Sequence, residues 1–145
     1  MATVREILAR KGPHVVTIGK DATVLDGALL MNEHKIGALV VLDDGQVVGM
    51  FTERDILQRV VAAQRDPART PIEEVMTTEV VCCAPETTIE EARGAMKNRR
   101  IRHMPLVDSE QRLQGLISIG DLNAYEASTQ EQTIYLLQEY MFGRV

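Results

Sequence analysis

Two short segments of the chain each place a hydroxyl residue three positions before an aspartate. "GMFTERDI" contains Thr52 and Asp55, and "GLISIGDL" contains Ser118 and Asp121. Such a pair can cap the first turn of a helix, because each side chain accepts a backbone N–H that the helix leaves free. The same groups can also bind a ligand, since free amides attract an anion and a carboxylate accepts hydrogen bonds from both hydroxyls of a ribose. The two interpretations are compatible, and both stay open at this point.

A second group of candidate residues is basic. The segment "KNRRIRHMP" gathers four basic residues and His103 in an otherwise acidic chain. The three basic residues before Ile101 fit the last turn of a helix, where cations are favourable. Arg102 and His103 lead into an apolar strand instead, and arginine suits phosphate through bidentate hydrogen bonding. His103 can alternatively be a core histidine with its hydrogen bonds satisfied.

The bulk properties restrict the class of protein. The chain has 145 residues, of which 45% are hydrophobic, so it can bury a core. A net charge of −5 and an aromatic content of 3% count against a nucleic-acid partner. No apolar run approaches the roughly 20 residues that span a bilayer, and the N-terminus lacks a secretory signal. We therefore expect a cytoplasmic protein with neither a membrane segment nor a nucleic-acid partner.

An internal duplication organises the elements that position these residues. Segments 24–56 and 89–122 superimpose with one short insertion, and a polar linker, residues 62–71, separates them. Two copies of this length indicate a duplicated domain rather than a solenoid. In the duplication, Arg102 and His103 correspond to Gly37 and Ala38. Any two sites built in this way therefore differ in charge.

Each copy predicts the order β-α-β-β-α, which makes the fold class α+β. Thr23 and Thr88 stand where a helix N-cap is needed, and Glu91 completes a capping box with Thr88. "DDG" at residues 43–45 is a strong signal for a hairpin turn. The predicted strands lie at residues 15–18, 38–42, 46–52, 80–83, 104–107 and 112–118.

The chain divides into three parts by sequence. These are a first repeat with an N-terminal helix (1–69), a second repeat (70–127) and a helical C-terminal tail (128–145). In the tail, Ile134, Leu137 and Met141 recur at helical spacing, with Tyr140 and Phe142 close by. This apolar stripe can pack on its own domain or contact a second chain, and the sequence leaves both open.

The duplicated pattern resembles the cystathionine-β-synthase (CBS) domain, which occurs in tandem pairs. "IGALVVLDDGQVVGMFTERDI" and "IRHMPLVDSEQRLQGLISIGDL" carry the resemblance, and "EVM" at residues 74–76 also fits. The resemblance covers about residues 3–127. It implies two pseudo-symmetric repeats packed through their sheets, with adenosyl ligands bound in clefts between them. It also implies a regulatory module that acts on a partner protein, as a homodimer with four repeats in a disc.

The resemblance assigns roles to individual residues. Thr52, Asp55, Ser118 and Asp121 would hold the ribose, and Arg102, His103 and Arg54 would meet phosphate. Residues at the strand entries would frame the adenine, although most such side chains are simply core. We expect AMP as the ligand, with NAD or ATP as alternatives. The full set of expected nucleotide contacts is Thr17, Ile18, Ile36, Gly37, Ala38, Thr52, Arg54, Asp55, Val81, Cys82, Arg102, His103, Met104, Pro105, Ser118 and Asp121.

Catalysis has little support in the sequence. No nucleophile-elbow motif, Walker A loop or GxGxxG is present, and the three histidines lack metal-ligand spacing. Cys82 and Cys83 are adjacent, so in an extended segment they point to opposite faces and form no disulfide. They could bind a soft metal or sense oxidants, but small buried hydrophobes are the simpler interpretation. We expect no enzymatic activity, no catalytic cofactor and no metal. The alternative function is a structural or oligomerisation module whose cleft is empty or takes another ligand.

Overall fold

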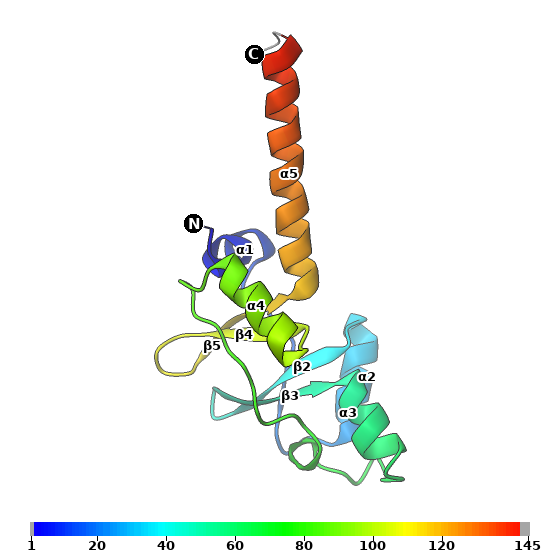
Figure 1. Cartoon of the computed structure of the whole chain (residues 1–145). Coiled ribbons are helices and arrows are strands. Elements are labelled where there is room, and N and C mark those ends of the chain that lie inside the picture. Colours follow the sequence, from blue (N-terminus) through cyan, green and yellow to red (C-terminus); the bar gives the residue numbers. More distant parts are fainter. Residues whose placement is uncertain (1, 143–145) are drawn as a thin grey trace.

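Two small sheets, one from each repeat, lie at the centre of the molecule, with helices packed around them (Figure 1). The computed structural model describes residues 2–142, apart from the side chains of residues 132, 135, 136 and 139–142. The elements are α1 (Val4–Lys11), β1 (Thr17–Gly19), α2 (Val24–His34), β2 (Ala38–Asp43), β3 (Gln46–Thr52), α3 (Glu53–Asp55), the π-helix η1 (Ile56–Val61), the 3-10 helix η2 (Ile72–Glu74), α4 (Ile89–Arg99), β4 (His103–Val107), β5 (Leu113–Ser118) and α5 (Ile119–Phe142).

The first repeat forms the sheet that the sequence predicts. Strand β1 pairs in parallel with β2, and β2 pairs antiparallel with β3. Asp44 and Gly45, between β2 and β3, have φ angles of 50° and 79°. Positive φ at both central residues is what a two-residue type I′ hairpin turn requires. The predicted hairpin is therefore confirmed.

The second repeat lacks one strand that the sequence predicts. The strand at residues 80–83 shrinks to a single parallel bridge between Cys83 and Leu106. Cys83 donates its N–H to the Pro105 carbonyl at 2.9 Å and accepts the Val107 N–H at 3.0 Å. The next bond of this parallel ladder would need an N–H on Pro105, and proline has none. Strand β4 therefore pairs fully only with β5, and the predicted strand was wrong in extent.

The helix caps form as predicted, with one addition. Thr88 accepts the Glu91 N–H at 3.0 Å and completes the predicted capping box. Thr23 accepts the Asp26 N–H at 3.1 Å, and Asp26 returns a bond to the Thr23 N–H. Aspartate thus completes in the first repeat the box that glutamate completes in the second.

The segment that precedes each repeat completes the core of the other repeat. Val4 and Ile7 of α1 are buried in the core of the second repeat, together with Ile117 and Leu122. Ile72 and the two residues after η2 are buried in the core of the first repeat. A third cluster joins the repeats, formed by Ala38, Val40 and Met50 with Val15, Leu42, Val47, Val80, Leu113 and Leu116. This exchange places α1 against β5 and the start of α5 (Figure 1).

Helix α5 combines two elements that the sequence treats separately. The helix that opens after Ser118 runs without a break to Phe142, and its C-terminal half projects away from both sheets (Figure 1). Ile134 and Leu137 are exposed on this projecting part. The side chains of Tyr140, Met141 and Phe142, which belong to the same predicted stripe, lie outside the described residues. Among the helices of residues 2–142, none combines the length and apolar character needed to cross a bilayer.

Candidate functional site

Each hydroxyl-x-x-aspartate segment lies next to the start of a neighbouring strand. In the first repeat, Ala38 pairs with Thr52, and in the second, His103 pairs with Ser118. The residue after each cap also donates its N–H to the strand entry, to the Gly37 carbonyl at 3.0 Å and to the Arg102 carbonyl at 2.9 Å. In the second repeat the structure therefore brings together the residues predicted to contact ribose and two of those predicted to contact phosphate, Arg102 and His103. In the first repeat the same place holds Gly37 and Ala38.

The first cap holds its carboxylate in a closed hydrogen-bond network. Asp55 is only 5% exposed. Its Oδ2 accepts the Thr52 N–H at 3.0 Å, and its Oδ1 accepts the Thr77 hydroxyl at 3.1 Å. The Arg59 guanidinium lies 4.0 Å from Oδ1. A ribose diol would have to displace these protein groups to reach Asp55.

The charge around the first cap also opposes a phosphate. The Glu53 side chain folds back over Gly37, and a Cβ placed on that glycine would lie 2.8 Å from the Glu53 carboxyl. Arg54, the predicted phosphate ligand of this repeat, is exposed beside it. The first cap therefore presents a carboxylate where the resemblance expects an anion.

The second cap is more open and carries an ion pair. Asp121 Oδ2 accepts the Ser118 N–H at 2.8 Å and the Lys11 ammonium at 2.7 Å, while its side chain stays 24% exposed. Burial alone would raise the pKa of Asp121, but the Lys11 and Ser118 hydrogen bonds outweigh it and lower the pKa below its ordinary value. Asp121 is therefore an ionised, accessible acceptor at neutral pH.

Lys11 is the site residue that the sequence did not reveal. A lysine in the last turn of a first helix is explained by the helix dipole, and nothing in its spacing links it to Asp121. Only the exchange of α1 between repeats brings the two together. The ammonium also donates to the Leu116 carbonyl at 2.8 Å, so its position is fixed from two sides.

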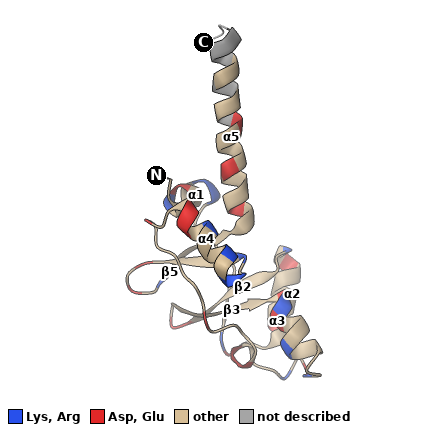
Figure 2. Ribbon diagram, viewed as in Figure 1, with Lys and Arg blue, Asp and Glu red and all other residues tan. Residues whose placement is uncertain are grey.

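Beside the second cap lie one further cation, Arg102, and a histidine, His103, whose surroundings favour the neutral imidazole. Burial, then the charges of Lys11 and Arg102, lower the pKa of His103, and Asp121 pulls it the other way. Arg102 is exposed at the entry to β4. Basic residues also gather at the C-terminal end of α4, just before this entry (Figure 2). At the second cap, the Asp121 carboxylate therefore lies beside a locally basic surface, although the chain as a whole is acidic.

The residues predicted to frame an adenine differ in burial, and only some have side-chain surface that a ligand could contact. Ile36 and Ile18 pack against the core of the first repeat, and Val81 packs against that of the second. Met104 and Pro105 are buried, which leaves their side chains little surface for a ligand. Thr17 and Cys82 are half-buried and retain some accessible surface.

The two cysteines are not activated thiols. Cys83 is buried, and burial, with a smaller effect of Cys82, raises its pKa to about 12. Burial also raises the pKa of Cys82. Both are therefore protonated at neutral pH, and a protonated thiol is a poor nucleophile and metal ligand. Within residues 2–142, no cluster of three or more histidine, cysteine or acidic side chains has the geometry to hold a metal ion.

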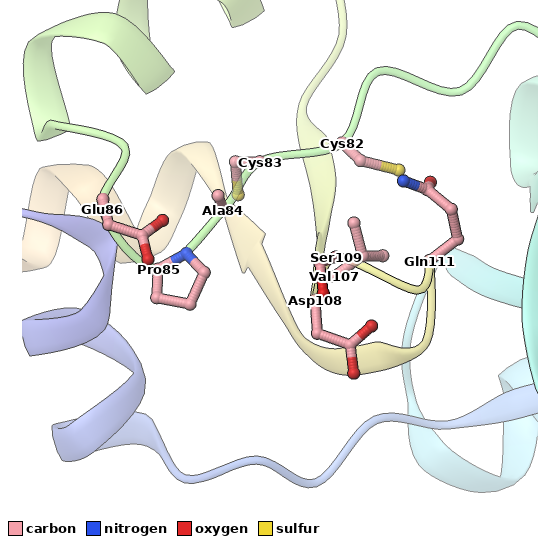
Figure 3. A pocket seen from close by; sticks show the side chains of 9 residues that line it. All are labelled: Cys82, Cys83, Ala84, Pro85, Glu86, Val107, Asp108, Ser109 and Gln111. Carbon is pink, nitrogen blue, oxygen red and sulfur yellow. The ribbon is translucent and has the colours of Figure 1, made fainter.

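A surface hollow of about 520 Å³ lies away from both caps (Figure 3). It lies between the Cys82 segment and the turn after β4, at the opposite end of that strand from His103. Its lining residues are Cys82, Cys83, Ala84, Pro85, Glu86, Val107, Asp108, Ser109 and Gln111. Of the predicted nucleotide contacts, only Cys82 lies in it. The hollow also contains two carboxylates and no basic residue, so it does not suit a phosphate.

Comparison with known proteins agrees with this architecture. The CBS domain family matches residues 4–62 and 72–128, so it accounts for both repeats. The CBS domain-containing protein YhcV of Bacillus subtilis is 35% identical over 130 residues, which cover 90% of this chain and 89% of that protein.

Two solved structures share the fold. The hexameric CBS-CP12 protein from bloom-forming cyanobacteria is 32% identical, with a TM-score of 0.72 over 83% of this chain and 65% of its own. The CBS domain pair of protein MJ0100, in complex with 5′-methylthioadenosine and S-adenosyl-L-methionine, is 23% identical, with a TM-score of 0.78 over 89% of this chain and 98% of its own. At that identity, the second structure supports the fold alone. Both repeats, their order and their packing therefore lead to one conclusion: the chain belongs to the CBS domain family and carries two CBS domains.

Proposed function

We propose that this CBS pair is a non-catalytic regulatory module that binds an adenosyl ligand at the second cap. The observation that carries the proposal is the pairing of an accessible carboxylate, Asp121, with Arg102 and His103 at one strand end. The carboxylate can accept the ribose hydroxyls, and the basic side chains can meet a phosphate. AMP satisfies both, and ADP, ATP and NAD share the same two groups. The MJ0100 pair, with its two adenosyl ligands, is consistent with this ligand class.

The geometry of the first cap argues for unequal sites. Asp55 is buried and already bonded to Thr52 and Thr77, and Glu53 adds negative charge beside Gly37. We propose that the second cap binds the ligand more tightly. Helix α5 begins at this cap and leaves the domain, so it is the element through which occupancy would reach a partner protein. For that to work, the ligand must favour one arrangement of the helix over another, typically by about 1–3 kcal/mol.

A thermal-shift panel with AMP, ADP, ATP, NAD and S-adenosylmethionine tests the ligand class. A ligand present at about 100 times its Kd stabilises the folded chain by about 2.7 kcal/mol. For a domain of this size, that raises Tm by about 5–10 °C. We expect the phosphate-bearing ligands to give the larger shifts. If millimolar concentrations of all five leave Tm unchanged, the structural or oligomerisation function replaces the regulatory one.

We also propose that the chain forms a homodimer in the cytoplasm. The helical face of the first repeat exposes four large apolar residues, Leu25 (40%) and Leu29 (58%) on α2 and Leu57 (63%) and Val61 (62%) on η1. The corresponding residues of the second repeat are Glu90, Gly94, Asn123 and Ala127. Because the second repeat folds without large apolar residues there, the fold itself does not require them. The hexameric CBS-CP12 protein shows that a related chain self-associates.

Leu29→Glu should weaken this association. A charge on an apolar face loses its water when a second copy packs on it, which costs several kcal/mol per ion. Sedimentation velocity should show a dimer for the unaltered chain and a monomer for Leu29→Glu. Ile134→Glu, which changes an exposed apolar residue on α5, is the matched control. If only the control dissociates, the dimer forms through the C-terminal helix instead.

A further inference from the structure

Lys11 uses one of the hydrogen-bond acceptor positions of Asp121 that the proposed ligand needs. Its ammonium lies 2.7 Å from Asp121 Oδ2, on the same oxygen that accepts the Ser118 N–H. A ribose hydroxyl that approaches Asp121 must share or replace this contact. Replacing it costs the charge-assisted hydrogen bond between the ammonium and the carboxylate.

The first repeat shows that this ion pair is not a requirement of the fold. Leu8 lies over Gly115 exactly where Met76 lies over Gly49 in the other repeat, so the segments that carry them are structural equivalents. In the first repeat, the exchanged segment reaches the cap aspartate through the neutral Thr77 hydroxyl, and the cation near it, Arg59, belongs to the helix after the same cap and lies 4.0 Å away. In the second repeat, the exchanged segment itself supplies the cation, Lys11, at 2.7 Å. The two sites therefore differ in the group that the exchanged segment brings to the cap aspartate, and in the second site that group is Lys11.

The lysine side chain can leave Asp121 while α1 stays in place. Tyr125 of α5 donates its hydroxyl to Glu6 at 2.7 Å, and the Arg10 guanidinium lies 5.0 Å from the centroid of the Tyr125 ring. Val4 and Ile7 anchor the same helix in the core. The Lys11 side chain itself is 34% exposed and ends a flexible four-carbon stem. Its release from Asp121 requires rotation of the side chain, which also loosens the hydrogen bond to the Leu116 carbonyl, and no movement of the helix.

We propose that Lys11 is a specificity-determining residue of the second site, which makes binding depend on a negative charge in the ligand. The inference rests on the proposed function and deepens it. An uncharged nucleoside that takes Asp121 leaves the ammonium with the Leu116 carbonyl but without an anionic partner. A nucleotide that takes Asp121 supplies a phosphate, which the released ammonium can approach together with Arg102 and His103. A cationic sulfonium ligand would instead be repelled by Lys11 and Arg102, while the neutral His103 can only donate a hydrogen bond.

The test compares Lys11→Met with Arg10→Met by calorimetric titration of adenosine and AMP. Methionine keeps the length and apolar stem of lysine and removes the charge. Arg10→Met removes one positive charge from the same helix and also loses contacts to α5, but it leaves Asp121 paired. We expect Lys11→Met to bind adenosine about two- to fivefold more tightly, the upper part of the usual range for removal of one partly exposed ion pair. AMP should bind to it no more tightly, so the preference for AMP over adenosine falls. Arg10→Met should keep the preference of the unaltered chain within about twofold.

The outcomes separate this inference from the proposed function. If the unaltered chain binds AMP and Lys11→Met binds adenosine no better, the specificity role of Lys11 is wrong and the proposed function stands. If the unaltered chain binds neither ligand and Lys11→Met gains adenosine, the lysine blocks the site to charged and uncharged ligands alike, so its charge-dependent specificity role is wrong and AMP is not the ligand of the unaltered chain. If neither protein binds either ligand, both are overturned. Equal gains in Lys11→Met and Arg10→Met would mean that loosened helix packing is the cause, and would also overturn the role of Lys11.

Discussion

Asp121→Asn should lower the affinity of the chain for AMP about 100-fold, with little change in Tm. Hydrogen bonds to a charged acceptor contribute about 1.5–3 kcal/mol each, and each 1.4 kcal/mol is a factor of ten in Kd. Asparagine keeps one oxygen for the Ser118 N–H, so the helix cap survives. It loses the charge and half of the acceptor capacity that a ribose diol needs. Calorimetric titration measures the affinity, and a thermal melt of the same sample measures Tm.

Asp55→Asn is the matched control, because it changes the equivalent residue of the first cap. Asp55 is buried and uses both oxygens within the protein, toward Thr52 and Thr77. Asparagine keeps one acceptor oxygen, so an amide N–H must replace the carboxylate oxygen that faces Thr77 and the Arg59 guanidinium, and loss of these interactions with a charged acceptor costs about 1–3 kcal/mol. We therefore expect a fall in Tm of about 3–10 °C and less than a threefold loss of AMP affinity. The opposite pattern, with binding lost in Asp55→Asn and kept in Asp121→Asn, would assign the ligand to the first cap.

Arg102→Ala should weaken AMP binding about 10- to 100-fold and leave adenosine binding unchanged. Arginine contacts phosphate through two parallel charge-assisted hydrogen bonds, and adenosine has no group that uses them. Arg102 is exposed at the entry to β4, so its loss leaves no cavity in the core.

The control for Arg102→Ala is Arg112→Ala, which removes an exposed arginine at the far end of the same hairpin. It should leave both affinities as they are. Equal weakening of AMP and adenosine by Arg102→Ala would show that Arg102 shapes the site without contacting phosphate. The prediction and its control are read from the same pair of calorimetric titrations.

The sequence predicted much of the fold because its signals are local. The hairpin at Asp44 and Gly45 and the caps at Thr23 and Thr88 depend on residues a few positions apart, and all formed as predicted. The duplication then placed the two aspartate caps at equivalent positions. One prediction from a local signal was wrong in extent. The predicted strand before α4 is a single bridge, because Pro105 has no N–H to continue the ladder of hydrogen bonds.

The features that distinguish the two caps were not predictable in the same way. They depend on the exchange of α1 and of the segment around η2 between the repeats, which is a property of packing over long sequence distances. That exchange brings Lys11 to Asp121 and Thr77 to Asp55. The sequence did indicate that the caps differ, through Glu53 and Arg54 in one and Ile119 and Gly120 in the other. It gave no sign that the larger difference would come from another part of the chain.

The most direct test of the central claim is a calorimetric comparison of AMP with 2′-deoxy-AMP on the unaltered chain. The two ligands have the same base and phosphate and differ in one hydroxyl, which Asp121 accepts in the proposed site. Loss of a hydrogen bond to a charged acceptor predicts binding of the deoxy ligand at least about tenfold weaker. In Asp121→Asn the difference between the two ligands should nearly disappear. Equal binding of AMP and 2′-deoxy-AMP to the unaltered chain would contradict the claim that the Ser118–Asp121 cap holds a ribose.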